Sequence, residues 1–316
     1  MSLKKNYYFW MFVLFFLVVL ATFLINIGIG SVEIPVKDVV KILTDGLIDG
    51  DTNSSIVWKI RLPRAIAVIF GGASIAVSGL IMQIFFRNPI VEPFVLGVSS
   101  GATLMVGLVI LGGAVLGIPP IFLNSWTTVG AAFFGSLLVM AINLIVASRV
   151  KSNVSLLVVG LMIGYVCSAL TNMLVTFAEE AQVKGFVVWQ MGSFSGFTWN
   201  SVKTLVIISI PLLLLSTLMH KPLNAMVLGE RYATSLGINI RLVKVFLIGV
   251  SSLLSASVTA FAGPVGFIGL AVPHGICDCI ARMLFSPTEI ALGSVTSLIG
   301  APLVAYLILR RNKDNG

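Results

Sequence analysis

Residue types that carry chemistry are scarce in this chain. Two of its 316 residues are histidines, His220 and His274, and three are cysteines, Cys167, Cys277 and Cys279. The pair Cys277-Asp-Cys279 has neither zinc-finger nor Cys-x-x-Cys spacing, and neither histidine has a partner at metal-ligand spacing. No His-Glu-x-x-His motif, carboxylate cluster or Walker A motif occurs. The sequence therefore predicts no catalytic residue, no metal site and no cofactor bound by this chain.

A polar segment at residues 224–241 is instead the feature best suited to bind a partner. Within it, residues 230–236 are predicted to form a short helix, because Gly237 follows where helices often end on a residue with positive φ. Basic residues flank the segment at His220, Lys221, Arg241 and Lys244. A structured, basic segment between two apolar runs indicates a surface offered to another protein. The alternative is an ordinary loop that contains one helical turn.

Composition places the chain in a membrane. Hydrophobic residues make up 58% of the sequence and charged residues 10%, and the mean hydropathy is +1.07. No soluble globular domain has this balance, so we expect a single all-α polytopic membrane domain over residues 1–316. The net charge of +8 fits the excess of Lys and Arg in cytoplasmic loops and does not require a nucleic-acid partner.

Eight apolar runs are predicted to span the bilayer as helices. Lys4 and Lys5 precede the first run, which is longer than a signal-peptide core and lacks a clear cleavage site. We therefore expect it to be retained, with its start in the cytoplasm, and counting from there puts the polar segment in the cytoplasm too. The predicted spans cover residues 9–27, 65–86, 94–111, 126–146, 156–177, 205–219, 243–261 and 290–309.

Between the first two spans the sequence predicts a surface helix and a basic cluster. Apolar residues recur at i, i+3, i+4 and i+7 from Val36 to Leu43, which is typical of an amphipathic helix along the membrane. Positive charges then stand at the predicted outer mouth of the second span, against the usual bias, at Lys59, Arg61 and Arg64. They either anchor the span by snorkelling or form a docking point for an acidic partner outside the membrane.

Small residues mark places where helix backbones are expected to approach closely. They include Gly72 and Gly79 in the second span, Gly97, Ser99, Ser100 and Gly101 at the start of the third, and Gly160 and Gly164 in the fifth. The run from Gly97 to Gly101 has no lysine after its glycines, so it is not a phosphate loop. It indicates either close helix packing or an unwound helix start beside a pathway. For each residue, plain packing is the alternative to contact with a substrate.

Several stretches, in colinear order over nearly the whole chain, resemble the FecCD-type permease subunits of iron–siderophore, haem and cobalamin ABC importers. No single motif is decisive, but coincidence is very improbable for so many in order. The motifs are Arg61-Leu-Pro-Arg64, Gly79-x-x-x-Gln83, Arg87-Asn-Pro-x-x-x-Pro93, Leu96-Gly-Val-Ser-Ser-Gly-Ala102, Trp189-x-x-Gly192-Ser193, Leu228-Gly-Glu-x-x-Ala-x-Ser-Leu-Gly237, Ala262-Gly-Pro-Val-Gly-Phe-Ile-Gly-Leu-x-Val-Pro-His274 and Ile299-Gly-Ala-Pro302.

The resemblance implies roles for several groups of residues. The polar segment would be the coupling helix that sits on a separate ATPase subunit, which binds ATP and Mg²⁺. The coupling residues would be Leu228, Gly229, Glu230, Ala233, Ser235, Leu236 and Gly237. Docking of an extracytoplasmic substrate-binding protein would use Arg61, Arg64 and Arg282. The small residues above, with Gln83, would pack or line a path between two permease copies, as a homodimer or close heterodimer.

The chain departs from the family pattern near its end. About thirty residues that the family has between its Pro-His motif and an Asp-x-x-x-Arg segment are missing between His274 and Asp278. The family's ten spans are therefore expected to be reduced to eight, plus a re-entrant segment over residues 265–285. Arg310, Arg311 and Lys313 favour a cytoplasmic C-terminus. The alternative is a single crossing with the C-terminus outside.

The function expected from this resemblance is import of an iron–siderophore complex, or of haem or cobalamin, across a bacterial cytoplasmic membrane. ATP hydrolysis would drive it on another chain. An ion-coupled secondary transporter is the chief alternative, but it should have paired ionisable residues within its spans, and the first seven spans have essentially none. A transport-impaired, shortened permease is a further alternative.

Overall fold

The computed structural model describes residues 2–266, apart from 29, 31, 33, 49, 89–90, 114–123 and 151. Every regular element in this part of the chain is helical, as predicted. The elements are α1 Ser2–Gly28, α2 Val36–Asp45, α3 Thr52–Ile56, the π-helical turn η1 Val57–Arg61, α4 Leu62–Phe86, the 3-10 turn η2 Pro93–Leu96, α5 Val98–Ile110, α6 Ser125–Arg149, α7 Asn153–Phe177, α8 Glu180–Gln190, α9 Trp199–Leu218, α10 His220–Leu228, α11 Glu230–Ser235 and α12 Ile240–Ala262.

Five helical stretches within the described residues are long and apolar enough to cross a membrane. They are Thr52–Phe86, Ser125–Arg149, Asn153–Phe177, Trp199–Leu218 and Ile240–Ala262, and Phe16–Gly28 and Val98–Ile110 are shorter apolar stretches. Five predicted spans are thus present as long apolar helices, and the first, residues 9–27, lies within α1. Residues 267–316 lie outside the described part of the chain. They include the last predicted span, Arg282, and all but the first two residues of the expected re-entrant segment. The expectation of eight spans therefore stays a prediction.

The third predicted span, residues 94–111, is wrong as a single helix. Its first residues form the turn η2, the chain breaks at Gly97 with φ +75°, and α5 then runs for only 13 residues. At 1.5 Å per residue, such a helix is about 20 Å long, shorter than the hydrocarbon core of a bilayer. An unwound start, one of the two alternatives for this stretch, is what the structure has.

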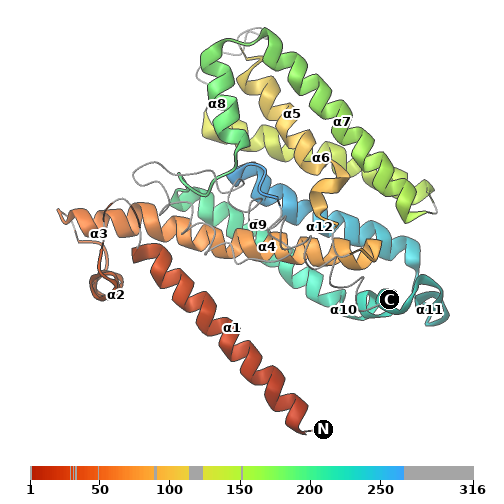
Figure 1. Ribbon diagram of the computed structural model, residues 1–316, viewed down its shortest axis with the longest axis horizontal. Coiled ribbons are helices and arrows are strands. Elements are labelled where there is room, and N and C mark those ends of the chain that lie inside the picture. Colours follow the sequence, from red (N-terminus) through yellow and green to blue (C-terminus); the bar gives the residue numbers. More distant parts are fainter. Residues whose placement is uncertain are drawn as a thin grey trace, which may run out of the picture.

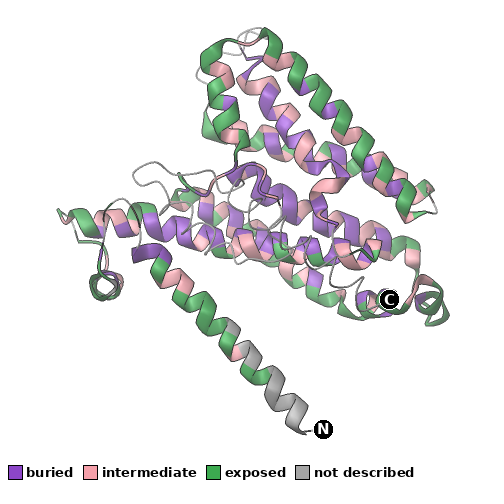
Figure 2. Cartoon of the chain, in the orientation of Figure 1, coloured by how far each residue is buried: buried purple, intermediate pink, exposed green. Residues whose placement is uncertain are grey.

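Helix α12 lies at the centre of the described fold and packs against α4, α5, α6 and α9 (Figure 1). Most of its length is buried, as is the facing side of α4 (Figure 2). Serines allow this close contact: the Ser78 hydroxyl on α4 lies 2.7 Å from the main-chain oxygen and 2.7 Å from the hydroxyl of Ser251 on α12. Buried apolar residues of α4, α10 and α12 form a continuous core around this contact.

Helices α5, α6, α7 and α8 form a second group, drawn above α12 in Figure 1. It joins the helices packed around α12, namely α4 and α9, mainly where α6 and α5 contact α12. Helix α7 is largely exposed and packs chiefly on α5, whereas α1 diverges from the bundle and contacts it only near α2, η1 and α4 (Figures 1 and 2). Exposed apolar helix surfaces of this kind suit contact with lipid or another membrane helix.

The bundle has two distinct ends. One end, called the far end below, carries α2, α3 and η1. The other end carries α10 and α11, which lie beside the last turn of α4 and the first turns of α7 and α12 (Figure 1). We call it the coupling end, after the role that the family resemblance implies for the polar segment. The predicted amphipathic helix is present as α2, with Val39 of the predicted apolar face buried and Val40 45% exposed. Its position along the membrane surface stays a prediction. Helix α8 was not predicted. Its signal is a capping box in which Glu179 and Gln182 bond each other's backbone N–H groups.

Candidate functional site

The polar segment folds as two short helices, α10 and α11, followed by the start of α12. The predicted helix over residues 230–236 is confirmed as α11, Glu230–Ser235. It ends at Gly237, whose φ of +79° and N–H bond to the Thr234 carbonyl, at 2.9 Å, make a C-terminal cap. A residue with a Cβ is strained at this φ, which explains why glycine stands there.

Apolar side chains on the polar segment divide between a buried side and an exposed one. Ala225, Met226 and Ala233 belong to the main core with Phe85 and Leu247. The exposed apolar residues are Val227, Leu228, Tyr232 and Leu236, with Leu228 69% and Leu236 58% exposed. This pattern leaves an apolar surface that faces away from the bundle. Of the other residues implied by the resemblance, Gly229 and Ser235 lie on the same segment, and Ser235 is exposed.

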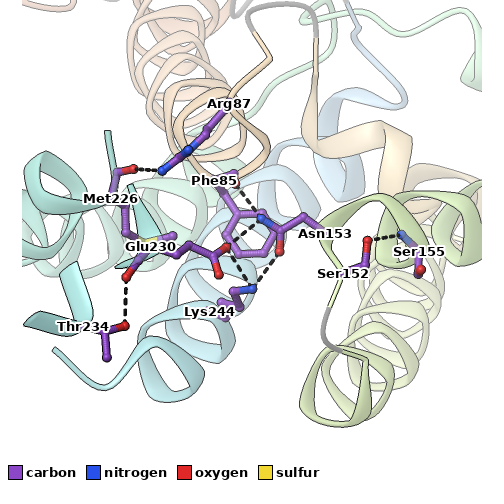
Figure 3. A network of polar contacts seen from close by, with 9 residues as sticks. All are labelled: Phe85, Arg87, Ser152, Asn153, Ser155, Met226, Glu230, Thr234 and Lys244. Atoms are coloured by element: carbon purple, nitrogen blue, oxygen red, sulfur yellow. Dashed lines mark hydrogen bonds and ion pairs between the residues drawn. The ribbon is translucent and has the colours of Figure 1, made fainter. Parts of the chain in front are cut away.

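A network of polar contacts holds the polar segment to three spans (Figure 3). The Nζ atom of Lys244 lies 3.0 Å from Oε1 of Glu230 and donates a 2.8 Å hydrogen bond to Oδ1 of Asn153. The amide nitrogen of Asn153 donates to Oε1 of Glu230 at 3.1 Å and to the Phe85 carbonyl at 3.2 Å. Arg87 donates to the Met226 carbonyl at 3.0 Å. Sequence analysis missed Asn153 and treated Lys244 only as a flanking charge.

A cavity of about 580 Å³ adjoins this network at the coupling end. It is lined by the outer part of the polar segment together with the ends of α4 and α7, that is, by Arg87, Asn153, Leu228, Gly229, Glu230, Arg231 and Tyr232. Both arginines are exposed, and the carboxylate of Glu230 is paired with Lys244. The cavity therefore has a basic and aromatic lining beside the exposed Leu228.

A second cavity, of about 330 Å³, lies between α5, α7 and the end of α8. Seven of its eight lining residues carry hydroxyl or amide side chains: Ser99, Ser100, Thr103, Ser168, Thr171, Asn172 and Gln190, with Pro264 the eighth. We call it the polar cavity. Two of the predicted residues, Ser99 and Ser100, face it. The others were missed, although Ser168, Thr171 and Asn172 fall on one face of a helix at spacings of three and four residues.

The predicted glycines are contact points between helices. A Cβ on Gly160 would lie 2.8 Å from Cα of Leu96, and one on Gly101 would lie 2.6 Å from the carbonyl oxygen of Gly135. Gly97 likewise meets the carbonyl of Gly160 and the backbone of Gly164. Close packing is thus what these positions require. Gly72, Gly79 and Gln83 lie on α4, and of these Gly79 is buried.

Two of the predicted docking arginines lie at the far end and are buried. Arg61 is 5% exposed, and its guanidinium donates to the carbonyls of Ile27 and Gly28 at 2.8 and 2.7 Å, and also to Val32. The carbonyls of Ile27 and Gly28 are the last of α1, where a cation is favoured. Arg64 is 7% exposed. A docking role for these residues stays a prediction, and the contacts of Arg61 give it a structural role.

Within the described residues, no three His, Cys, Asp or Glu side chains gather where they could hold a metal ion. The groups that do gather are hydrogen-bond donors and acceptors, one ion pair with an amide, and exposed apolar side chains. Such groups can bind a partner surface or a polar solute and can transmit movement between helices.

Comparison with known proteins gives consistent matches. A model of the FecCD transport family matches residues 17–276. The vitamin B12 import system permease protein BtuC of Klebsiella pneumoniae is 36% identical over 280 residues, 80% of this chain and 82% of that protein. The hemin transport system permease protein HmuU of Yersinia pestis is 34% identical over 285 residues, 82% and 84% of the two chains.

A solved structure has the same arrangement of helices. It is described as an inward-facing conformation of a metal-chelate type ABC transporter, and the match has a TM-score of 0.79 with 25% sequence identity. The alignment covers 93% of this chain and 97% of that chain. The helical bundle described above is therefore similar to that of a transporter over nearly its whole length.

Proposed function

The chain belongs to the FecCD transport family as a multi-pass, non-catalytic permease subunit of an ABC importer, and from this premise we propose that its cargo is a metal chelate. Relatives at 36% and 34% identity are named for vitamin B12 and hemin import, and the similar solved structure for metal chelates. All of these cargoes are bulky chelates. Within the class, a ferric siderophore is our first candidate, followed by haem and cobalamin.

The polar cavity supports this assignment as part of the route. Its hydroxyl and amide lining offers hydrogen bonds without a fixed charge. A chelate presents many oxygen and nitrogen atoms, and a neutral lining can bind these weakly enough to release them. We propose that the α7 side of this cavity faces the path between this chain and a second permease copy, identical or closely related.

The observation that carries the proposal is the exposed polar segment anchored on three spans at the coupling end. Leu228 and Leu236 present apolar surface away from the bundle, while Ala233 is fully buried beneath them. Such a segment suits a cleft in a separate ATPase subunit, which would hold ATP and Mg²⁺. We propose that the coupling end faces the cytoplasm of a bacterium, with both chain termini on that side, and that a substrate-binding protein docks at the far end.

Uptake of labelled cargo tests the proposal. A strain that lacks this chain would be given a labelled ferric siderophore, haem or cobalamin, with and without the chain restored. We expect restoration to recover uptake of one of the three. Uptake of none of them, in a strain where the ATPase co-purifies with the chain, would overturn the metal-chelate assignment and favour a transport-impaired permease.

Two substitutions test the polar segment. Gly237→Pro removes the N–H that bonds the Thr234 carbonyl and imposes a φ near −65° where the chain has +79°. Glu230→Arg places a cation against Lys244. We expect both to abolish co-purification of the ATPase while the chain still inserts in the membrane. Retained co-purification would contradict the proposed role. A reporter fused after Gly316 tests the side of the C-terminus, and extracellular exposure would contradict the proposed orientation.

A further inference from the structure

Lys244 is a buried cation whose surroundings explain its burial. It lies in the second turn of α12, with its side chain 10% exposed. Burying an ammonium group is costly unless charged and hydrogen-bonding partners surround it. Here Glu230 supplies the counter-charge and Asn153 supplies an oxygen, and the ring of Phe85 lies 5.9 Å from Nζ. The three partners come from α11, α7 and α4, so one side chain joins four helices (Figure 3).

Asn153 has a single amide orientation that satisfies its neighbours. Lys244 can only donate, so it requires the amide oxygen, whereas the Glu230 carboxylate and the Phe85 carbonyl can only accept and require the amide nitrogen. The side chain therefore connects α4, α7, α11 and α12 in one fixed arrangement. Asparagine is suited to this place because aspartate would offer two acceptors and no donor.

The short helix α11 needs such a connection. It has only six residues, and glycines with positive φ stand at both ends, Gly229 at +133° and Gly237 at +79°. Ala233 is the only buried residue of α11, and element-terminal positions such as these glycines absorb changes in φ and ψ, so α11 can turn about its contact at Ala233. Glu230 is the first residue of α11, so its bonds to Lys244 and Asn153 oppose that rotation.

Helix α7 leads from this network to the polar cavity. Asn153 is its first residue, and Ser168, Thr171 and Asn172 line the cavity further along the same helix. Asn172 is about 28 Å from Asn153 at 1.5 Å per residue. Helix α7 contains no proline, unlike α9 with Pro211, and a helix without a kink moves as a rod.

We propose that Asn153 and Lys244 are positioning residues that fasten the polar segment to α7, so that movement imposed on α11 by the ATPase reaches the α7 wall of the polar cavity. The inference rests on the proposed function. It adds the two residues through which nucleotide-driven movement enters the spans. Without them, α11 turns about Gly229 and Gly237, and ATP hydrolysis proceeds without moving the cavity wall.

The test measures movement at the cavity and needs no cargo. Cys167, Cys277 and Cys279 are replaced by serine, and the exposed cavity residue Asn172 becomes the only thiol through Asn172→Cys. The chain is reconstituted with its ATPase, and the labelling rate of the thiol by a water-soluble maleimide is compared between the nucleotide-free state and the state trapped with ATP and vanadate. We expect trapping to change this rate in the otherwise native chain.

Variants of the network should lose that change while the ATPase stays bound and active. In Lys244→Met the cation is absent, and Asn153→Asp keeps the side-chain volume but sets a carboxylate against Glu230 and the Phe85 carbonyl. Lys203→Met is the control, because Lys203 is an exposed cation on α9, outside the polar segment and the network. A merely structural role would lower thermal stability and assembly, but it would not remove the nucleotide-dependent labelling from a complex that still hydrolyses ATP.

Each outcome decides the inference. The inference is overturned if labelling in Lys244→Met and Asn153→Asp still responds to nucleotide, as it should in Lys203→Met. If Lys244→Met fails to assemble with the ATPase, two further variants decide: Lys244→Arg, and the double variant Glu230→Lys with Lys244→Glu. The inference is supported if either variant assembles and shows the nucleotide-dependent change in labelling. It is overturned if neither variant does. If the native chain binds no ABC ATPase, the proposed function fails and this inference with it. If the native complex assembles and its labelling responds to nucleotide, the proposed function stands, and the variants then test the inference alone.

Discussion

Arg61 and Lys244 are buried cations at opposite ends of the bundle, and they are held in different ways. Arg61, at the far end, donates to main-chain carbonyls in and just after the last turn of α1. Lys244, at the coupling end, is held by the side chains of Glu230 and Asn153. Main-chain acceptors fix one helix against another. Side-chain partners on separate helices can part and pair again, so the contacts of Lys244 suit the transmission proposed above.

The largest effect on stability is expected at the far end, from Arg61→Met. It removes a charged donor from the two buried carbonyls of Ile27 and Gly28, and hydrogen bonds to charged groups contribute about 1.5–3 kcal/mol each, so we expect a loss of about 3 kcal/mol or more. Thermal unfolding of the purified chain in detergent measures it. Lys59→Met, which removes an exposed cation two residues away, should be nearly neutral. Weaker binding of the substrate-binding protein at unchanged stability would instead support a docking role for Arg61.

About two turns along α7 from Asn153, helices are joined by backbone contact rather than by charge. In Gly160→Ala the new Cβ would lie 2.8 Å from Cα of Leu96, so α7 must move away from η2. Overpacking of this kind costs about 1–3 kcal/mol. The same unfolding measurement checks it, with Gly130→Ala as the control, because nothing lies within 4 Å of a Cβ at Gly130 on α6. An unchanged unfolding temperature in Gly160→Ala would show that this contact is not tight.

At the coupling end, Lys244→Met should lower stability less than Arg61→Met does. The side chain of Glu230 is 39% exposed, so water can solvate it when its partner is gone, and partly exposed pairs contribute about 1 kcal/mol or less. We expect a small shift in unfolding temperature together with loss of cargo uptake at retained ATP hydrolysis. A loss of stability as large as that of Arg61→Met would remove the distinction between the two cations.

The smallest effect is expected from Gly237→Ala. A Cβ at φ +79° costs about 1 kcal/mol, and because the residue is exposed we expect local fraying of α11 rather than global unfolding. Hydrogen–deuterium exchange of residues 233–238 should become faster. Gly196→Ala has the same strain at φ +82° but lies between α8 and α9. It should leave exchange in the polar segment unchanged, and a similar effect of both variants would contradict a local role for Gly237.

Features that depend on neighbours along the chain were predictable. Helix α11 and its end at Gly237 follow from local turn chemistry, and five of the predicted spans follow from long apolar runs. The third span failed because hydropathy does not register that Gly97 breaks the helix where it meets Gly160 and Gly164. Helix α8 was not predicted, because it lies between two apolar runs and only the capping residues Glu179 and Gln182 mark its start.

For the site, the sequence by itself determined the membrane class, the family and the position of the polar segment, because composition, colinear motifs and helix-ending residues are local properties. The tertiary structure decided which polar residues meet. Asn153, Glu230 and Lys244 are far apart in sequence and become partners only when α7, α11 and α12 pack side by side. It also decided that Arg61 faces the end of α1, because burial depends on contacts that no stretch of sequence contains.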